Sequence, residues 1–216
     1  MPARHWWDVE WRKEHQHHVF NSDSRPGASE NNVWWTGDGG QVAWTIYGYE
    51  SLWLPASLLA PDSQQRLADA LFAASRHDWV ELHFNKGIAG APPEAVAMTR
   101  DTATNPAVLS AFALAIIAEG EGGYPGVRGH EPDVEAARKA RNDVHRAMNE
   151  LRAVAPNGGA YVSESDFFEN DWQHSYWGAN YARLASIKKK YDPSGLFFVH
   201  NGVGSEEWSP DGFTKL

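Results

Sequence analysis

The chain has 216 residues, with 28 acidic against 19 basic side chains and a formal net charge of -9 at pH 7. Its length is sufficient for a hydrophobic core of its own, whereas its negative charge argues against nucleic acid as a partner, and no apolar run is long enough to cross a bilayer. The absence of cysteine excludes disulfide bonds, thiolate metal sites and a cysteine nucleophile.

The first half of the chain alternates between loop-forming and periodic segments. In chain order it predicts a short amphipathic helix within residues 1–20, a loop at 21–40, a strand at 41–49, a helix at 61–77 and a strand at 79–85. Leu52 to Pro55 is expected to lead from the first strand toward the helix, which Pro61-Asp62 can start.

The second half continues the alternation. It predicts a short helix opened by Pro92-Pro93, a strand at 111–118, a helix at 133–154, a strand at 161–166, a helix at 179–191 and a strand at 196–199. The apolar run at 111–118 fits either a buried strand or a buried helix, and its glycine- and proline-containing flanks favour the strand. The helix at 133–154 is the clearest, because its apolar residues recur every three or four positions.

Strands interleaved with helices indicate an α+β fold, an antiparallel β-sheet with helices packed on one face. We expect one domain over residues 25–216, preceded by an extension or interdomain remnant at 1–24. A doubly wound parallel sheet is not expected, because the sequence contains no Gly-x-Gly-x-x-Gly and no P-loop. The start, Met1 to Trp7, has no apolar secretory segment, so we expect a cytoplasmic location by default.

Eleven tryptophans are the compositional oddity of the chain. Indole packs well and offers one N–H donor, so tryptophan-rich chains often line cavities for flat or sugar-like ligands. A tryptophan-rich core is the alternative, and composition does not separate the two.

A histidine cluster near the start raises the question of a metal. His15 with His18, and Glu14 with His18, have the spacing of ligands on one helix face. No recognisable distant ligand completes a coordination sphere, so we expect no metal site and interpret the cluster as a solvated helix face.

Four blocks follow one another near the C-terminus: Tyr161–Asp166, Tyr176–Leu184, Lys188–Pro193 and Phe197–Gly204. In order and spacing they resemble the C-terminal segment of the berberine-bridge-enzyme-like FAD-linked oxidases, which belong to the vanillyl-alcohol-oxidase type of flavoprotein. Looser similarity to the substrate domain of microbial members extends over Asn32–Asp38, Tyr49–Pro55 and Leu82–Gly87. The resemblance therefore covers about 190 residues, from about Arg25 onward.

The resemblance implies a function and an incomplete chain. In this family the domain lays a β-sheet over the isoalloxazine ring of FAD and supplies acid/base residues, while a separate N-terminal domain holds the phosphates and adenine. That domain, with its glycine-rich loop, is absent here. The expected function is the substrate-binding and flavin-facing part of an FAD-dependent oxidoreductase. It would oxidise an alcohol, sugar or amine-type substrate with O2 as acceptor, together with a companion FAD-binding chain.

Tyr161 is the first catalytic candidate. Hydride transfer from an alcohol or amine needs a group that takes the O–H or N–H proton, and a tyrosine with a lowered pKa can serve. The family's Tyr-x-Asn-x-x-Asp motif matches Tyr161, Ser163 and Asp166, with serine in place of asparagine, so Asp166 is a second candidate. On a strand Tyr161 and Asp166 would need a bend to cooperate. The alternative is a Tyr161 that packs in the core with a bonded hydroxyl.

Further candidates surround these two. His83 and Asn85 share one face of a predicted strand, where His83 is a third catalytic candidate or simply a satisfied polar group. By resemblance, Asn201 and His200 after the last strand, together with Tyr161, are expected at the flavin. Asn85, Lys86 and Trp35 are expected to bind substrate. A non-catalytic ligand-binding module and a truncated remnant without flavin are the alternatives to an enzyme.

Overall fold

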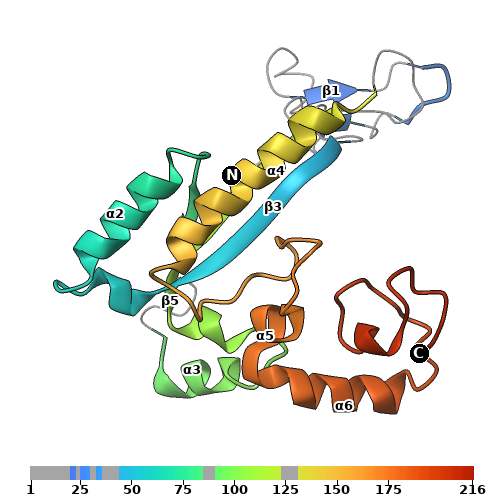
Figure 1. The fold of residues 1–216 in the computed structure, drawn as a ribbon. Coiled ribbons are helices and arrows are strands. Elements are labelled where there is room, and N and C mark those ends of the chain that lie inside the picture. Colours follow the sequence, from blue (N-terminus) through green and yellow to red (C-terminus); the bar gives the residue numbers. More distant parts are fainter. Residues whose placement is uncertain (1–19, 23–24, 30–32, 36–43, 85–90, 123–130) are drawn as a thin grey trace, which may run out of the picture. The chain divides into compact units, whose positions relative to one another are not determined.

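The computed structural model describes residues 20–22, 25–29, 33–35, 44–84, 91–122 and 131–216 (Figure 1). The chain divides into two compact units, each described here by itself. The first comprises Met1–Thr45 with Gly120–Val134, and the second comprises Ile46–Glu119 with Glu135–Leu216.

A short strand pair lies in the first unit. The strands β1 (Phe20–Ser22) and β2 (Val33–Trp35) are antiparallel, with Phe20 opposite Trp35. The sequence predicted a loop over 21–40, and the pair corrects that prediction. Val33–Trp35 consists of β-branched and aromatic residues, which favour extended pairing even within a polar loop.

Longer elements make up the rest of the described chain. In order they are β3 (Trp44–Pro55), η2 (Ala56–Leu59), α2 (Gln64–Ala74), β4 (Glu81–Phe84), α3 (Pro93–Thr99), η3 (Pro106–Leu109), β5 (Ala111–Gly122), α4 (Val134–Arg152), α5 (Trp172–Trp177), η4 (Gly178–Asn180), α6 (Tyr181–Tyr191) and η5 (Ser205–Glu207). Among these described helices, none is long and apolar enough to cross a membrane.

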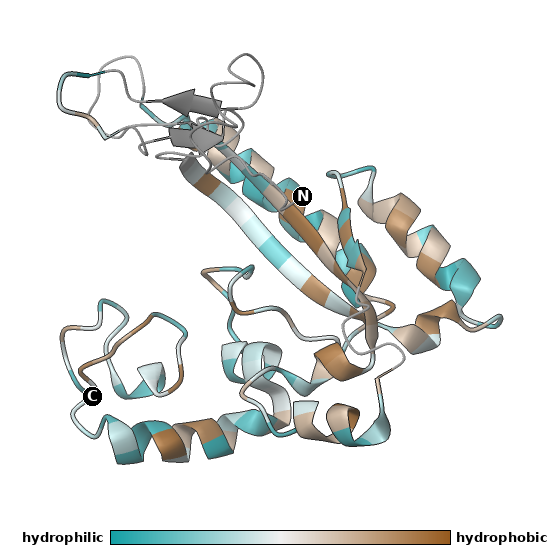
Figure 2. Ribbon diagram, turned by 180° about the vertical axis from the view of Figure 1, so that it is seen from behind, coloured by the Kyte–Doolittle hydropathy of each residue, from teal (hydrophilic) through white to brown (hydrophobic). Residues whose placement is uncertain are grey.

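Three of the strands form one sheet in the order β3-β5-β4. β4 runs antiparallel to β5, with Glu81 opposite Ile116 and His83 opposite Leu114. β5 contains the apolar run 111–118, and its ribbon is largely hydrophobic in Figure 2. The residues from Ala113 to Ile117 are all buried, so both faces of this central strand are covered, and an uninterrupted apolar sequence suits such a strand.

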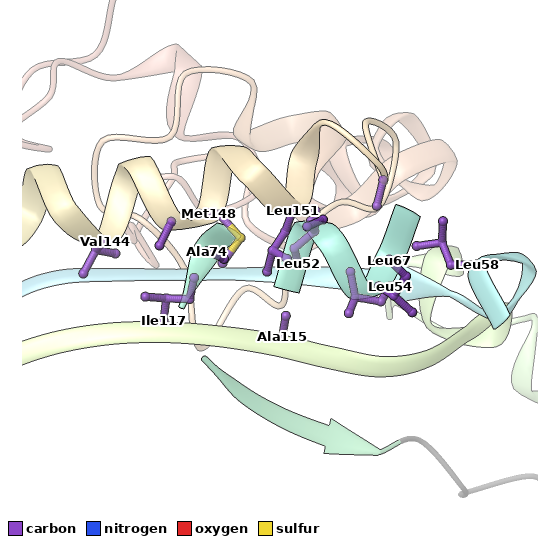
Figure 3. Packing of buried hydrophobic residues seen from close by; sticks show 13 residues of the cluster. Leu52, Leu54, Leu58, Leu67, Ala74, Ala115, Ile117, Val144, Met148 and Leu151 are labelled. Atoms are coloured by element: carbon purple, nitrogen blue, oxygen red, sulfur yellow. The ribbon is translucent and has the colours of Figure 1, made fainter. Parts of the chain in front are cut away.

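The core lies between one face of this sheet and two helices (Figure 3). The sheet contributes Leu52, Leu54, Ala115 and Ile117, the helix α2 contributes Leu67, Ala70 and Ala74, and α4 contributes Val144, Ala147, Met148 and Leu151. On each helix these residues recur three or four positions apart and so form one apolar stripe. The predicted α+β architecture with helices on one sheet face is confirmed.

A buried carboxylate ties β3 to α4 at the edge of this core. The Glu50 side chain is 4% exposed, and its two oxygens lie 2.7 Å from Arg152 and 3.1 Å from His145. A buried charge requires such partners. Glu50 therefore helps to fix the position of β3 against α4, in addition to the apolar contacts.

β3 is longer than the sequence predicted. Leu52–Pro55 was expected to lead toward a helix, but it continues the strand, because Leu52 and Leu54 alternate with Ser51 and Trp53 and pack into the core. The helices α2, α3, α4 and α6 and the strands β4 and β5 lie where they were predicted, within a few residues at each end. The helix α5 was not predicted, and the helix predicted within residues 1–20 falls outside the described residues.

The predicted strand at 161–166 is wrong. The segment is a turn in which the Glu164 amide donates to the Tyr161 carbonyl at 2.9 Å. The Ser165 hydroxyl donates to the Val162 carbonyl, and an Asp166 oxygen accepts from the Phe168 amide. Such side-chain bonds to nearby backbone compete with strand pairing.

The predicted strand at 196–199 is also absent from the structure. Asp192 accepts hydrogen bonds from the amides of Leu196 and Phe197, and Lys188 donates to the Phe197 carbonyl. These side chains take the backbone groups that a strand would offer to a neighbour. These hydrogen bonds instead hold the segment against the end of α6.

Candidate functional site

The face of the sheet opposite the helices carries aromatic and polar side chains. On β3, Leu52 and Leu54 point to the helices, so alternation directs Tyr47, Tyr49, Ser51 and Trp53 to the opposite face. The pairing of β4 with β5 places Glu81 and His83 on that same face, beside Ile116 and Leu114. We call the surface formed by these eight residues the second face.

The Tyr161–Glu164 turn is anchored to the second face. The Tyr161 amide donates to the Ser51 hydroxyl at 3.0 Å, and the Trp53 amide donates to the Gly159 carbonyl at 3.0 Å. The rings of Trp53 and Tyr161 meet edge to face, with centroids 6.2 Å apart. Tyr161 therefore lies against β3, although it is not itself part of a strand.

The charges on this face are acidic. Burial, together with the nearby carboxylates of Glu164 and Glu81, raises the pKa of the Tyr49 hydroxyl. Its hydroxyl therefore remains protonated at neutral pH and acts as a donor. A ring nitrogen of His83 lies 2.7 Å from a Glu81 oxygen, which orients the imidazole along the strand.

Two polar atoms on this face are buried without a hydrogen-bond partner in the described part of the chain: the Tyr47 hydroxyl and the Trp53 indole nitrogen. Flat aromatic surface with spare donors fits the ring system of FAD, whose edge carries carbonyl and nitrogen acceptors. The phosphates of FAD do not fit here, because the charged pair Glu81 and Glu164 would repel them. The second face thus fits one end of the cofactor.

His200 and Asn201 support a neighbouring loop. A ring nitrogen of His200 lies 2.9 Å from the Phe167 carbonyl oxygen, and the Asn201 amide donates to the same oxygen at 3.1 Å. The rings of His200 and Phe167 are stacked 4.0 Å apart. In this structure both residues therefore fix the chain just after the Tyr161–Glu164 turn.

Asp166 lies apart from Tyr161 in the structure. Its carbonyl accepts a hydrogen bond from the Tyr176 hydroxyl at 2.8 Å, and its side chain lines a polar hollow with Arg141 and Arg152. Tyr161 lines a different hollow, which contains Trp53 and Trp177. The turn separates the two motif residues that resemblance had paired.

The structure does not bring the remaining predicted residues together at one place. His83 lies on the second face as expected from its strand. Asn85 and Lys86 lie outside the described residues. Trp35 ends β2, which belongs to the first unit and is described separately from this site.

Three residues of the site were not among the sequence-based candidates: Tyr49, Glu81 and Glu164. Tyr49 could have been identified from the alternation of Tyr47, Tyr49, Ser51 and Trp53, once the strand is extended to Pro55. Glu164 lies inside a family block, but only the turn brings its charge near Tyr49.

Comparison with known proteins identifies the class. Residues 160–204, which include the Tyr161–Glu164 turn and the His200–Asn201 loop, match the family described as berberine and berberine like. This match confirms the resemblance expected from the sequence.

Individual relatives are FAD-linked. The chain is 39% identical over 82 residues to the VAO-type flavoprotein oxidase VAO615 of Thermothelomyces thermophilus, covering 38% of this chain and 14% of that protein. It is 50% identical over 62 residues to the FAD-linked oxidoreductase ZEB1 of Gibberella zeae, covering 29% of this chain and 11% of the relative. The chain therefore spans only a small part of the curated relatives it matches.

Two solved structures share the fold. The VAO-type flavoproteins MtVAO713 and MtVAO615 of Myceliophthora thermophila C1 each superpose with a TM-score of 0.58, at 22% and 28% identity. The match covers 76% and 75% of this chain but 27% and 28% of theirs. The likeness to MtVAO713 concerns the fold alone.

Proposed function

We propose that residues 25–216 are the substrate-binding and flavin-facing domain of an FAD-dependent oxidoreductase. The full reaction is oxidation of an alcohol, sugar or amine-type substrate with O2 as electron acceptor. The observation that carries the proposal is the second face itself. It combines aromatic rings, unpaired donors and carboxylates with a turn from a flavoprotein family segment anchored across it.

The residues of this domain would handle protons. Bound FAD supplies the two-electron acceptor. Removal of a hydride from an alcohol or amine carbon leaves an O–H or N–H proton, which an adjacent base must take. The carboxylate of Glu164 and the His83–Glu81 pair can accept it, and Tyr161 lies on the same turn as Glu164. Tyr49, whose pKa is raised, donates a hydrogen bond that orients substrate.

A companion FAD-binding chain would hold the phosphates. The support is that the acidic second face suits the ring end of FAD but not its phosphates. Near His200 the side chains of Leu196, Phe197 and Val199 are 77%, 73% and 69% exposed. Exposed apolar clusters of this kind mark interaction surfaces, and we assign this one to the FAD-binding partner.

A non-catalytic ligand-binding module is the second candidate function. The aromatic hollow that contains Trp53, Tyr161 and Trp177 favours it, because such a hollow can bind a ligand without flavin. A truncated remnant without flavin would retain the fold and bind neither ligand.

Lumiflavin, the ring of FAD without its phosphates, tests the proposal directly. We expect saturable quenching of lumiflavin fluorescence by the purified chain, because aromatic side chains stack on the ring. Tyr49→Leu should weaken binding, whereas Tyr191→Leu, on the exposed side of α6, should not.

Two results would contradict the proposal: a folded chain that causes no saturable quenching, or Tyr49→Leu and Tyr191→Leu variants that bind alike. Trp177→Leu separates the second face from the hollow, since Trp177 lies on α5 and lines the hollow only. If Trp177→Leu abolished lumiflavin binding, the flavin would bind in the hollow and not on the second face.

A further inference from the structure

A polar hollow lies between α4 and the loop that follows the Tyr161–Glu164 turn. Its volume is about 630 Å³, including space open to solvent. The helix and the loop each contribute four residues to its walls: Arg141, Asn142, His145 and Arg152 from α4, and Asp166, Phe168, Glu169 and Asn170 from the loop. Since α4 packs on the sheet face opposite to the second face, the hollow is separate from the candidate site.

Both walls of the hollow are fixed before any ligand binds. The apolar stripe of α4 is part of the core, and Arg152 is held by the buried Glu50 at 2.7 Å. In the loop, the Asp166 carbonyl accepts a hydrogen bond from the Tyr176 hydroxyl at 2.8 Å, and an Asp166 side-chain oxygen accepts from the Phe168 amide at 3.1 Å. A preformed site loses less conformational entropy on binding.

Arg141 is the strongest binding group in the walls. Its guanidinium lies over the ring of Phe168, with the guanidinium carbon 4.3 Å from the ring centroid. Among the described residues it has no carboxylate partner. A guanidinium that lies flat on an aromatic ring keeps the N–H groups at its edge, and that edge matches a carboxylate in two parallel hydrogen bonds.

Three neighbouring side chains have spare hydrogen-bonding groups. Asn142 and Asn170, one on each wall, have carboxamides without a partner in the described part of the chain, so each can donate to a ligand oxygen. His145 uses Nδ1 for Glu50 at 3.1 Å. Because Glu50 accepts that bond, Nε2 of the neutral imidazole is an acceptor and suits a donor on the ligand.

The acidic residues of the loop limit the charge of the ligand. Both oxygens of Glu169 accept hydrogen bonds within their own segment. One oxygen of Asp166 accepts from the Phe168 amide, which leaves the other available. These two negative charges disfavour a dianion such as phosphate, whereas a single carboxylate balances the unpaired Arg141. The available oxygen of Asp166 requires a donor on the ligand as well.

We propose that this hollow binds a small monocarboxylate that carries a hydrogen-bond donor beside the carboxylate, as 2-hydroxy acids and amino acids do. The carboxylate binds the edge of Arg141 and the amides of Asn142 and Asn170. The hydroxyl or ammonium group donates to Asp166. This is a second ligand site, and it does not depend on the proposed function.

Binding of lactate and alanine to the full chain without flavin tests the inference. The two compounds differ only in their donor, and saturation-transfer NMR should detect one or both through the methyl signal, with saturation on titration. Arg141→Met keeps the side-chain stem and should weaken binding by about tenfold, the scale of a lost charge-assisted hydrogen bond. Arg146→Met is the matched control, because Arg146 is an exposed residue of the same helix that does not line the hollow.

Competition defines the ligand class. Propanoate, which lacks the donor, and methyl lactate, which lacks the charge, should bind at least about tenfold more weakly, and inorganic phosphate should not displace the bound compound. Binding of lactate alone would assign the site to 2-hydroxy acids, and binding of alanine alone to amino acids.

The inference would be overturned if neither compound bound to folded protein, or if phosphate or propanoate bound as well as they do. Equal binding by Arg141→Met and Arg146→Met would also overturn it. If Arg141→Met does not fold, Asn170→Ala replaces it, since Asn170 is an exposed residue of the opposite wall. Unchanged binding in that variant would likewise contradict the site.

Discussion

At the scale of single residues, Asp192 shows what a family motif does physically. Its carboxylate accepts from the Lys188 ammonium at 2.5 Å and from the amides of Leu196 and Phe197 at 2.8 and 3.1 Å. The block Lys188–Pro193 therefore contains a clasp, formed by Lys188 and Asp192, that ends α6 and holds the exposed segment 196–199. The motif could be recognised from the sequence, but this role depends on contacts that the sequence does not display.

Stability should depend on the charge of Asp192. The hydrogen bond from Lys188, with help from the Phe197 and Leu196 amides, holds the pKa of this carboxyl below its usual range. A lowered pKa contributes stability above about pH 3.9, the unfolded value, and that contribution disappears as pH falls through the folded value. Asp192→Asn should therefore lower the Tm at pH 7, and the difference from the original chain should shrink in acid.

Thermal melts followed by circular dichroism at neutral and strongly acidic pH would measure this effect. Glu94→Gln is the control, because Glu94 is an exposed carboxyl on α3, outside the clasp. A Tm difference for Asp192→Asn that is as large in acid as at pH 7 would refute the charge-based explanation.

At the scale of elements, α4 was predictable and the 161–166 turn was not. The apolar stripe of α4 repeats with helical period over 19 residues, and a local pattern suffices to define such a helix. In the turn, alternating residues suggested a strand, but bonds from Ser165 and to Asp166 favour a compact turn. Those bonds are local, yet the turn and a paired strand differ too little in free energy for the sequence alone to decide between them.

The site depends on elements brought together from distant parts of the chain. The Ser51–Tyr161 bond joins residues 110 positions apart. Strand periodicity can say that Tyr49 and Ser51 share a face, but it cannot say which loop covers them. His83 and Tyr161 could be named as candidates from the sequence, whereas the proximity of Glu164 to Tyr49 required the fold.

The junction between β3 and α4 gives a prediction at this scale. Arg152→Met removes the closer partner of the buried Glu50 and leaves that charge with His145 alone. The free energy of unfolding should fall by about 2–3 kcal/mol, because a buried charge loses compensation. Urea denaturation at neutral pH would measure the change.

Arg146→Met provides a matched control on the same helix. Arg146 is mostly exposed and approaches Asp143 only at 3.7 Å, so its loss should change stability by less than about 0.5 kcal/mol. Equal losses in the two variants would mean that Glu50 does not depend on Arg152.

At the scale of the whole molecule, the chain combines a continuous core with a candidate site on the other face of the sheet. Sheet, α2 and α4 bury a continuous apolar cluster, so the α+β domain has its own basis for folding. The second face, by contrast, offers aromatic rings, donors and carboxylates, and the proposal assigns this face to the ring end of FAD. Near His200 the side chains of Leu196, Phe197 and Val199 are exposed, and these are the residues that the proposal assigns to an FAD-binding partner.

The visible absorbance of the chain isolated from its native cells tests the central claim most directly. Tagged at its own gene and purified gently, it should carry a flavin spectrum at about one flavin per chain. A substrate of the alcohol, sugar or amine type should bleach this spectrum without air, and O2 should restore it. A colourless, folded preparation that releases no FAD on denaturation would contradict the assignment of this chain as the flavin-facing part of an oxidase.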